Sequence, residues 1–133
     1  MDRIEEVKKE MLEKKVWAVI GATPDQEKFG YKIYKKLKSH GYTVYGINPK
    51  YDSLDGDKLY KSLKDLPEKP ECIDMVVNPK LSKAALDEIE DLGIQYVWFQ
   101  PGTFDEEVID IAEGKGLNIV FYDCVLVALG GDH

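Results

Sequence analysis

A short segment of the chain, VIGATPDQEKFG, carries residue types that can hold an anion. Gly21 ends an apolar run, Thr23 follows two residues later, and Lys28 stands where an amphipathic pattern begins. Glycine lets a backbone approach a ligand closely, and the N-terminus of a helix favours negative charge. The segment therefore predicts a site for a phosphate or pyrophosphate, with the neighbouring Asp25 and Glu27 pointing away from it. A plain strand-to-helix connection is the alternative interpretation.

Three apolar runs of the chain are followed by a carboxamide residue and a proline. These pairs are Asn48-Pro49, Asn78-Pro79 and Gln100-Pro101. In a parallel sheet the carboxyl ends of all strands lie at one edge, and ligands bind there. Three such pairs at one edge indicate a rim that fixes the direction of a ligand. Each pair by itself is also typical of simple strand termination.

The segment that begins at Gly21 and the segment Asn48-Pro49-Lys50 can be compared with the dinucleotide fingerprint. This fingerprint is G-x-G-x-x-G followed by an acidic residue about 20 positions later. After Gly21 the next glycine is Gly30, and Asn48-Pro49-Lys50 stands in place of the acidic residue that binds a ribose hydroxyl. A lysine there favours a phosphorylated ribose. The pattern argues against NAD and favours a ligand with an additional phosphate, such as NADP or coenzyme A (CoA). A solvated loop lysine at Lys50 is the alternative.

The sequence offers no set of residues for catalysis or metal binding. His40 precedes a glycine that ends a helical pattern, a place that suits a cation, and His133 is the last residue. With no other histidine, a Ser-His or Cys-His pair is not expected. Cys72 and Cys124 make neither a disulfide framework nor a metal site. We therefore expect no catalytic residues and no bound metal.

The elements that would position these residues alternate along the chain. Apolar runs predict strands at residues 16–21, 42–48, 73–78, 94–100 and 117–123. Amphipathic patterns predict an additional N-terminal helix over residues 2–14 and further helices from about Lys28 to Gly41, over 81–92 and over 104–115. Thr103 and Glu106 have the spacing of a capping box for the last of these helices. Residues 49–58 are expected to form a turn-rich loop, and 59–67 a strand end with a short helical turn.

This alternation predicts an α/β fold with helices on both faces of a parallel sheet. The sheet is expected to be Rossmann-like, doubly wound and five-stranded, in the order 3-2-1-4-5. A length of 133 residues predicts one domain, residues 1–133, whose core covers residues 15–128. All three carboxamide-proline pairs would then lie beside the Gly21 loop.

Composition excludes several classes of function. The net charge of -7 argues against a surface for nucleic acid. No apolar run approaches the roughly 20 residues that span a bilayer, and the charged first segment is unlike a signal peptide. Two cysteines without a disulfide framework favour a cytoplasmic location.

Several of these blocks, in order, resemble a known family. The stretch from VIGATPDQEKFG to GINPK, followed by IDMVVNPK, VWFQPG and GLNIVFYDC, is similar to stand-alone Rossmann-type domains of the CoA-binding protein family. These are similar to the N-terminal domain of the succinyl-CoA synthetase alpha subunit. The resemblance covers about residues 14–128. It implies that CoA or acyl-CoA is the ligand.

The resemblance also implies which segments bind CoA. It places pyrophosphate at the first loop and the following helix, the 3′-phospho-adenosine near the end of the second strand, and the pantetheine arm past the third and fourth strands. Many family members carry other residues where this chain has Asn78. The implied cofactor-binding residues are Gly21, Ala22, Thr23, Lys28, Phe29, Gly30, Tyr31, Asn48, Pro49, Lys50, Val77, Asn78, Pro79, Gln100, Pro101 and Gly102.

The sequence therefore favours a non-catalytic protein that binds CoA or acyl-CoA. Cys124 follows the last strand, close to the expected ligand, and is interpreted either as an inert buried thiol or as a redox thiol that forms a disulfide with CoA. One alternative function is an NADP-binding oxidoreductase or redox sensor, and another is the CoA-binding subunit of a split acyl-CoA ligase. Most residues of an aromatic set are expected to pack in the core or on a sheet face, and a homodimer contact of some of them with the N-terminal helix is the alternative interpretation. The set is Tyr31, Tyr34, Tyr45, Tyr96, Trp98 and Phe99.

Overall fold

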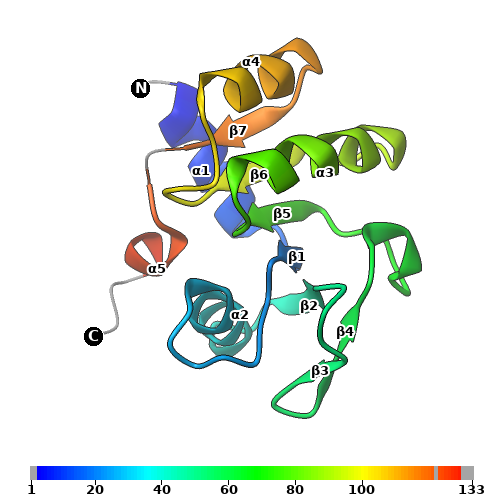
Figure 1. The fold of residues 1–133 in the computed structure, drawn as a ribbon. Helices are drawn as coiled ribbons and strands as arrows, with labels where there is room; N and C mark the ends of the chain where they lie inside the picture. The colour runs from blue at the N-terminus through cyan, green and yellow to red at the C-terminus, as the bar shows by residue number, and fades with distance from the viewer. Residues whose placement is uncertain (1–2, 122, 130–133) are drawn as a thin grey trace.

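A mainly parallel sheet forms the centre of the computed structural model, which describes residues 3–121 and 123–129 (Figure 1). The strands of this sheet run in the order β3-β4-β2-β1-β5-β6-β7, and only the β3–β4 pair is antiparallel. Their bounds are β1 (Val16–Ile20), β2 (Thr43–Ile47), β3 (Ser53–Leu54), β4 (Asp57–Tyr60), β5 (Cys72–Met75), β6 (Tyr96–Phe99) and β7 (Asn118–Val120).

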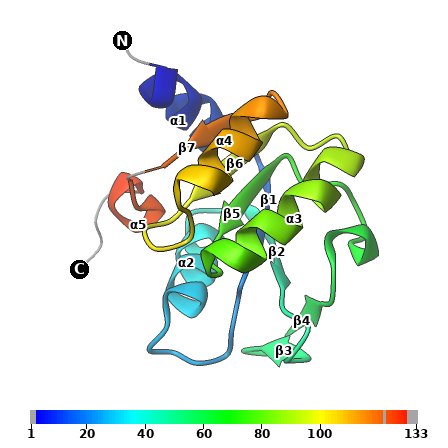
Figure 2. The same cartoon turned by 45° about the horizontal axis from the view of Figure 1, so that its top comes forward.

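Helices cover both faces of the sheet. On one face lie α1 (Arg3–Glu13), α2 (Phe29–Ser39) and the short α5 (Val125–Ala128), whose apolar side chains pack around Trp17 and Trp98. On the other face lie α3 (Pro79–Asp91), α4 (Glu106–Gly114) and a 3-10 turn, η1 (Leu63–Asp65), packed on Ile73 and Phe99. Figure 2 shows α3 and α4 together on their side of the sheet. The central strand β1 is buried between these layers, which explains its continuous apolar run.

The predicted fold class is confirmed, and the strand order is roughly as predicted. With β4 counted as the third strand the parallel strands run 3-2-1-4-5-6, whereas the strand predicted as the third, β5, pairs with β1. Within the described residues the sheet has two strands more than the five predicted. The additional strands arise from a hairpin whose turn is Asp55-Gly56, with φ of 49° and 86°. Positive φ at both positions is typical of a type I′ hairpin turn, and Asp-Gly is a common sequence for it. The loop expected at residues 49–58 therefore contains β3 and the first part of β4.

Three other element boundaries differ from the predictions. The third predicted strand ends at Met75, before Asn78, and α3 begins at Pro79, because Asn78 caps that helix. The helix α4 is capped by Asp105, whose side chain accepts a hydrogen bond from the Val108 N–H. The predicted Thr103 capping box is wrong. The segment after the last predicted strand, where no element was predicted, contains α5.

Among the described residues, no helix has the length and apolar character that crossing a bilayer requires.

Candidate functional site

A cavity of about 850 Å³ lies at the carboxyl ends of the parallel strands. Its walls come from the β1–α2 connection, the loop after β2, the β5–α3 connection, the β6–α4 connection and the start of α5. Its volume lies within the range typical of cofactor sites. The topology therefore gathers segments that are far apart in the sequence at one edge of the sheet, as doubly wound sheets do.

Two glycines bring α2 close to the end of β1. Gly21 has φ of 106°, and its N–H donates to the Ile47 carbonyl oxygen at 2.9 Å. A Cβ atom on Gly30 would lie 2.0 Å from the Gly21 carbonyl oxygen, so no other residue fits there without moving the helix. In the dinucleotide fingerprint the third glycine has this packing role. Here Gly30 has this role, although its separation from Gly21 in the sequence differs from that of the glycines in the fingerprint.

The β1–α2 connection directs a helix N-terminus toward the cavity. Lys28 is the N-cap residue of α2, the first turn of α2 contains no acidic residue, and both Lys28 and Thr23 line the cavity. The Asp25 carboxylate accepts a hydrogen bond from the Glu27 N–H within the loop. Glu27 itself lines the cavity, contrary to the expectation that it points away. The free N–H groups of the first helical turn and Lys28 nevertheless make this wall suitable for an anion.

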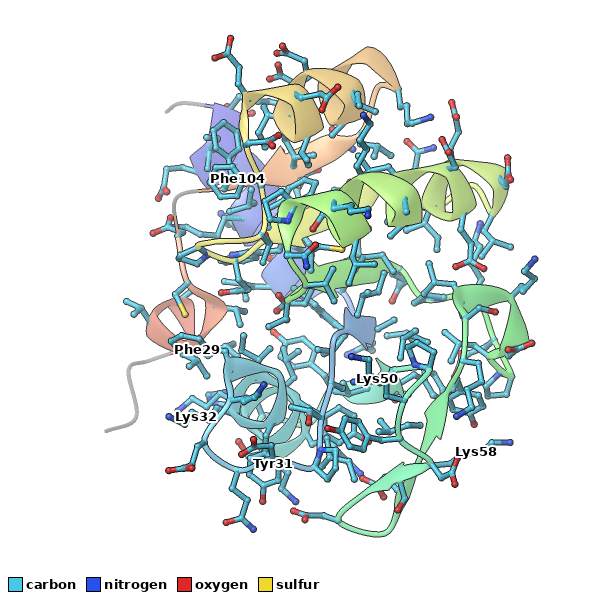
Figure 3. The ribbon with its side chains drawn as sticks, viewed as in Figure 1. Phe29, Tyr31, Lys32, Lys50, Lys58 and Phe104 are labelled. Atoms are coloured by element: carbon cyan, nitrogen blue, oxygen red, sulfur yellow. The ribbon has the colours of Figure 1, made fainter. Side chains whose placement is uncertain are left out.

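The loop after β2 is fixed by Asn48. The Asn48 Nδ2 group donates to the Ala22 carbonyl oxygen at 2.8 Å, and Oδ1 accepts from the Lys50 N–H at 2.9 Å. Lys61 Nζ donates to the Pro49 carbonyl oxygen at 3.1 Å. Lys50 is exposed and lines the cavity (Figure 3). The carboxamide of Asn48 therefore holds two loops together and sets the position of Lys50.

The β5–α3 connection is organised by Asn78. The Oδ1 atom of Asn78 accepts a hydrogen bond from the Leu81 N–H at 2.9 Å, as an N-cap side chain does. Between the end of β5 and this cap, Val76 and Val77 contribute apolar wall to the cavity. The Ser82 hydroxyl donates to the Val77 carbonyl oxygen. Asn78 therefore shapes α3 and borders the cavity at the same time.

The β6–α4 connection contains a buried polar network. The Nε2 group of Gln100 donates to Asp74 Oδ1 at 2.7 Å, and Gln100 Oε1 accepts from the Val125 N–H at 3.3 Å. The Thr103 hydroxyl donates to the Gln100 carbonyl oxygen at 2.7 Å. Burial raises the pKa of the Asp74 carboxyl to about 8, and the hydrogen bond from Gln100 lowers it in part. Asp74 was not predicted from the sequence, since a lone acidic residue within an apolar run gives no signal of its partner.

The cysteines and His40 lie in different environments. Cys124 is half-buried, is the N-cap residue of α5 and lines the cavity. Cys72 is buried at the start of β5, and burial raises the pKa of its thiol. His40 is the C-cap residue of α2, away from the cavity lining, and the second histidine, His133, lies outside the described residues. In the ranges 3–121 and 123–129 no group of His, Cys, Asp and Glu could hold a metal ion.

Most of the residues expected at the site line this cavity. Three do not: Ala22 is buried beneath it, Tyr31 donates to Asp55 Oδ2 at 2.6 Å, and Pro79 begins α3. The cavity also has lining residues that were not predicted from the sequence. They come from the ends of β1 and β2, from the face of α3, from the loop after β4 and from other positions in the four connecting loops. These additional residues are Ile20, Glu27, Ile47, Tyr51, Lys61, Ser62, Val76, Leu81, Ala85, Glu88 and Thr103.

Comparisons with known proteins point to one family. The chain is 34% identical over 119 residues to the alpha subunit of the ADP-forming acetate–CoA ligase II of Pyrococcus furiosus, a match that covers 81% of this chain and 26% of that protein. It spans less than a fifth of the length of two other archaeal acetate–CoA ligases, from Archaeoglobus fulgidus and Methanocaldococcus jannaschii.

Two solved structures of similar length also match. A conserved hypothetical protein from Pyrococcus furiosus has a TM-score of 0.81 and 35% identity, covering 86% of this chain and 98% of that one. A hypothetical protein from Pyrococcus horikoshii has a TM-score of 0.81 and 36% identity, covering 90% of this chain and 84% of that one. The family model of the CoA binding domain matches residues 15–130, and the chain therefore belongs to the CoA-binding domain family.

Proposed function

We propose that this protein binds CoA or acyl-CoA in the cavity at the carboxyl ends of its strands. The observation that carries the proposal is that one cavity joins the N-terminus of α2, Lys50 and the Gln100–Cys124 wall, in a chain of the CoA-binding domain family. CoA has a pyrophosphate, a ribose phosphate and a long uncharged arm. The N-terminus of α2 suits the pyrophosphate, Lys50 suits the ribose phosphate, and the Gln100–Cys124 wall suits the arm.

The pyrophosphate is proposed to bind at the N-terminus of α2, near Thr23 and Lys28. The 3′-phosphate is proposed to bind at Lys50, on the loop that Asn48 holds. Lys28, Lys50 and Lys61 line the cavity together with two carboxylates, Glu27 and Glu88. The cavity therefore has an excess of positive charge although the whole chain has a net charge of -7.

The pantetheine arm is proposed to pass Val77 and Asn78 and to end near Gln100, Gly102 and Cys124. Val76, Val77, Leu81 and Ala85 supply apolar surface along this path. We propose no catalytic role, because the sequence offers no nucleophile paired with a base.

A second candidate function is the CoA-binding subunit of a split acyl-CoA ligase. It is favoured by the similarity to the alpha subunit of an acetate–CoA ligase, of which this chain spans 26%. An activity of that kind would need a partner chain that binds the nucleotide and the acid. An NADP-binding oxidoreductase or redox sensor is the third candidate, and it shares the requirement for a phosphate at Lys50. For the stand-alone function we propose the cytoplasm as the location.

A ligand panel tests the proposal. Thermal unfolding is measured with CoA, acetyl-CoA, dephospho-CoA, NADP and NAD. A ligand present at 100 times its Kd stabilises the native state by about 2.7 kcal/mol. We expect CoA and acetyl-CoA to raise the Tm more than dephospho-CoA, and NADP and NAD to leave it unchanged. A shift with NADP and none with CoA would contradict the proposal and favour the oxidoreductase.

A further inference from the structure

The carboxyl group of Asp74 lies in the interior of β5 and is fully buried. Its side chain is on the sheet face covered by α1, α2 and α5, with Val19 and Trp98 as its partners on the neighbouring strands. Oδ1 accepts the hydrogen bond from Gln100, whereas Oδ2 has no partner among the described residues. A buried polar atom without a partner is costly and rare in native proteins.

Gln100 connects this buried group to the wall of the cavity. Its side chain is only 3% exposed, and the residue lines the cavity. Because Asp74 accepts and the Val125 N–H donates, the carboxamide can satisfy both partners in one orientation only, with Nε2 toward Asp74 and Oε1 toward α5. The Val125 N–H belongs to the residue after Cys124. The orientation of Gln100 thus determines where the first turn of α5 is anchored.

We propose that Asp74 is a positioning residue for CoA binding: its carboxyl group accepts from Gln100 and holds it in the orientation that anchors the start of α5 and the Cys124 wall of the cavity. The inference rests on the proposed function, since it concerns the end of the cavity assigned to the pantetheine arm. Asp74 itself is absent from the cavity lining, so it acts through Gln100.

Ionisation of Asp74 would disturb this arrangement. A carboxylate needs several donors, and among the described residues only Gln100 supplies one. The charged form would bind the Gln100 N–H more strongly, but Oδ2 would then be a buried charge without a donor, so water must enter beside Gln100 and loosen the start of α5 that Gln100 anchors. Burial raises the pKa of this carboxyl to about 8. The neutral form is therefore dominant at pH 7, and the competent arrangement is lost as the pH rises above about 8.

Other titratable groups lie on the same face of the sheet, and their effect on the pH dependence must be distinguished from that of Asp74. Cys72 lies on β5 itself, Cys124 begins α5, and the Lys8–Asp123 ion pair links α1 to the segment before α5. The tyrosines in or against this layer are Tyr31 and Tyr34 from α2, Tyr42 from the segment before β2, and Tyr96 from β6.

The pH dependence of CoA binding tests the inference. Isothermal titration calorimetry is performed on the full chain, which is the background for every variant. Since the apparent Kd scales with the competent fraction, we expect about a tenfold loss of affinity between pH 7 and pH 9. Asp74→Asn keeps an acceptor for Gln100 and cannot ionise, so its affinity should change less than about threefold over the same range.

Matched variants define the alternative outcomes. Asp91→Asn replaces an exposed carboxylate at the end of α3 and should keep the pH dependence of the background. Asp74→Ala removes the acceptor and should weaken CoA binding at pH 7 by at least about tenfold, which the Asn variant restores. The inference is overturned if Asp74→Asn loses affinity with pH as its background does, or if Asp74→Ala binds CoA normally.

A second measurement does not depend on any variant at Asp74 or on CoA. In the ligand-free chain, the NMR signals of the Val125 amide and the Gln100 side-chain amide should titrate together, with a midpoint near the pKa of about 8. Signals that stay constant from pH 7 to pH 9 contradict the positioning role. If these signals titrate while CoA fails to bind at pH 7, the proposed function fails and the Asp74–Gln100 link stands.

Discussion

Individual residues at the cavity differ in how firmly the protein already holds them. The side chains of Asn48, Asn78 and Gln100 have hydrogen-bond partners within the protein, so their first role is to fix loops and helix ends. Lys50 makes no ion pair with the described residues and is free to meet a phosphate. At the residue scale, specificity for the ligand is therefore expected from Lys50 more than from the three carboxamides.

Lys50→Ala tests this assignment. Loss of the ammonium group should weaken CoA binding about tenfold or more and should leave dephospho-CoA nearly unaffected, because a charged hydrogen bond contributes about 1.5–3 kcal/mol. Lys58→Ala is the matched control, since Lys58 is an exposed lysine on β4 outside this cavity (Figure 3). Isothermal titration with both ligands measures the difference. Equal losses for the two ligands would remove the 3′-phosphate from Lys50.

Cys124 carries a second prediction at this scale. With CoA disulfide as the oxidant, the Cys124 thiolate attacks one sulfur, a protein–CoA disulfide forms, the S–S bond of CoA disulfide breaks, and one CoA leaves as the thiolate. Mass spectrometry should find one adduct that dithiothreitol removes. Cys72 is the internal control, because its buried thiol should remain unmodified in the native protein. An adduct on Cys72, or none on Cys124, contradicts the prediction.

At the scale of elements, helix and strand ends build the site. The helix α2 begins at the cavity because Gly30 allows close packing on Gly21, and α3 begins there because Asn78 caps it. The hairpin of β3 and β4 is held to α2 by Tyr34 and Lys38, which both donate to Asp57. The loop that carries Lys50 thus joins β2 to a hairpin that is itself attached to α2. These walls are therefore fixed by contacts within the protein itself.

The cap of α3 gives a prediction at this scale. Asn78→Ala should lower the free energy of unfolding by about 1 kcal/mol, because the Leu81 N–H loses its acceptor. Asn78→Ser keeps a capping oxygen and should restore most of this stability. Urea denaturation measures both variants. If CoA affinity changes in parallel with stability in the unchanged chain and the two variants, Asn78 shapes the cavity through the helix. If the variants lose CoA affinity without losing stability, Asn78 contacts CoA directly.

At the scale of the whole molecule, most aromatic residues are used within the fold. Tyr34, Trp98 and Phe99 are buried, and Val7 and Met11 of α1 pack into the same protomer. The large apolar side chains that remain exposed among the described residues are Phe29, Tyr51, Leu81 and Val127, and three of them line the cavity. Apolar surface is therefore concentrated around the proposed ligand.

We still propose a homodimer, but through a different surface from the one predicted from the sequence. Its contact would involve the exposed Phe29 and Val127, since Trp98 and Phe99 of the sheet are buried and Tyr45 and Tyr96 are half-buried. Multi-angle light scattering should then show a dimer without CoA, and Phe29→Ser should weaken it. Tyr51→Ser is the matched control on the other side of the cavity. A monomer at all concentrations contradicts the proposal.

The sequence by itself determined the alternation of strands and helices, and with it the edge at which a ligand would bind. Buried strands and amphipathic helices are local patterns, so Gly21, Lys50 and Gln100 could be placed at strand ends without coordinates. The β3–β4 hairpin was accessible in the same way through Asp55-Gly56, and it was missed because its strands are short.

Only the tertiary structure decided which of these residues are held by the protein and which are available to a ligand. Hydrogen bonds such as Asp74–Gln100 and Asn48–Ala22 join residues that are 26 positions apart in the chain, and no local pattern encodes such pairs. The walls formed by Leu81, Ala85 and Lys61 likewise depend on how α3 and the loop after β4 pack at the sheet edge. Side-chain partners across a sheet follow from strand order and register, and both are properties of the folded chain.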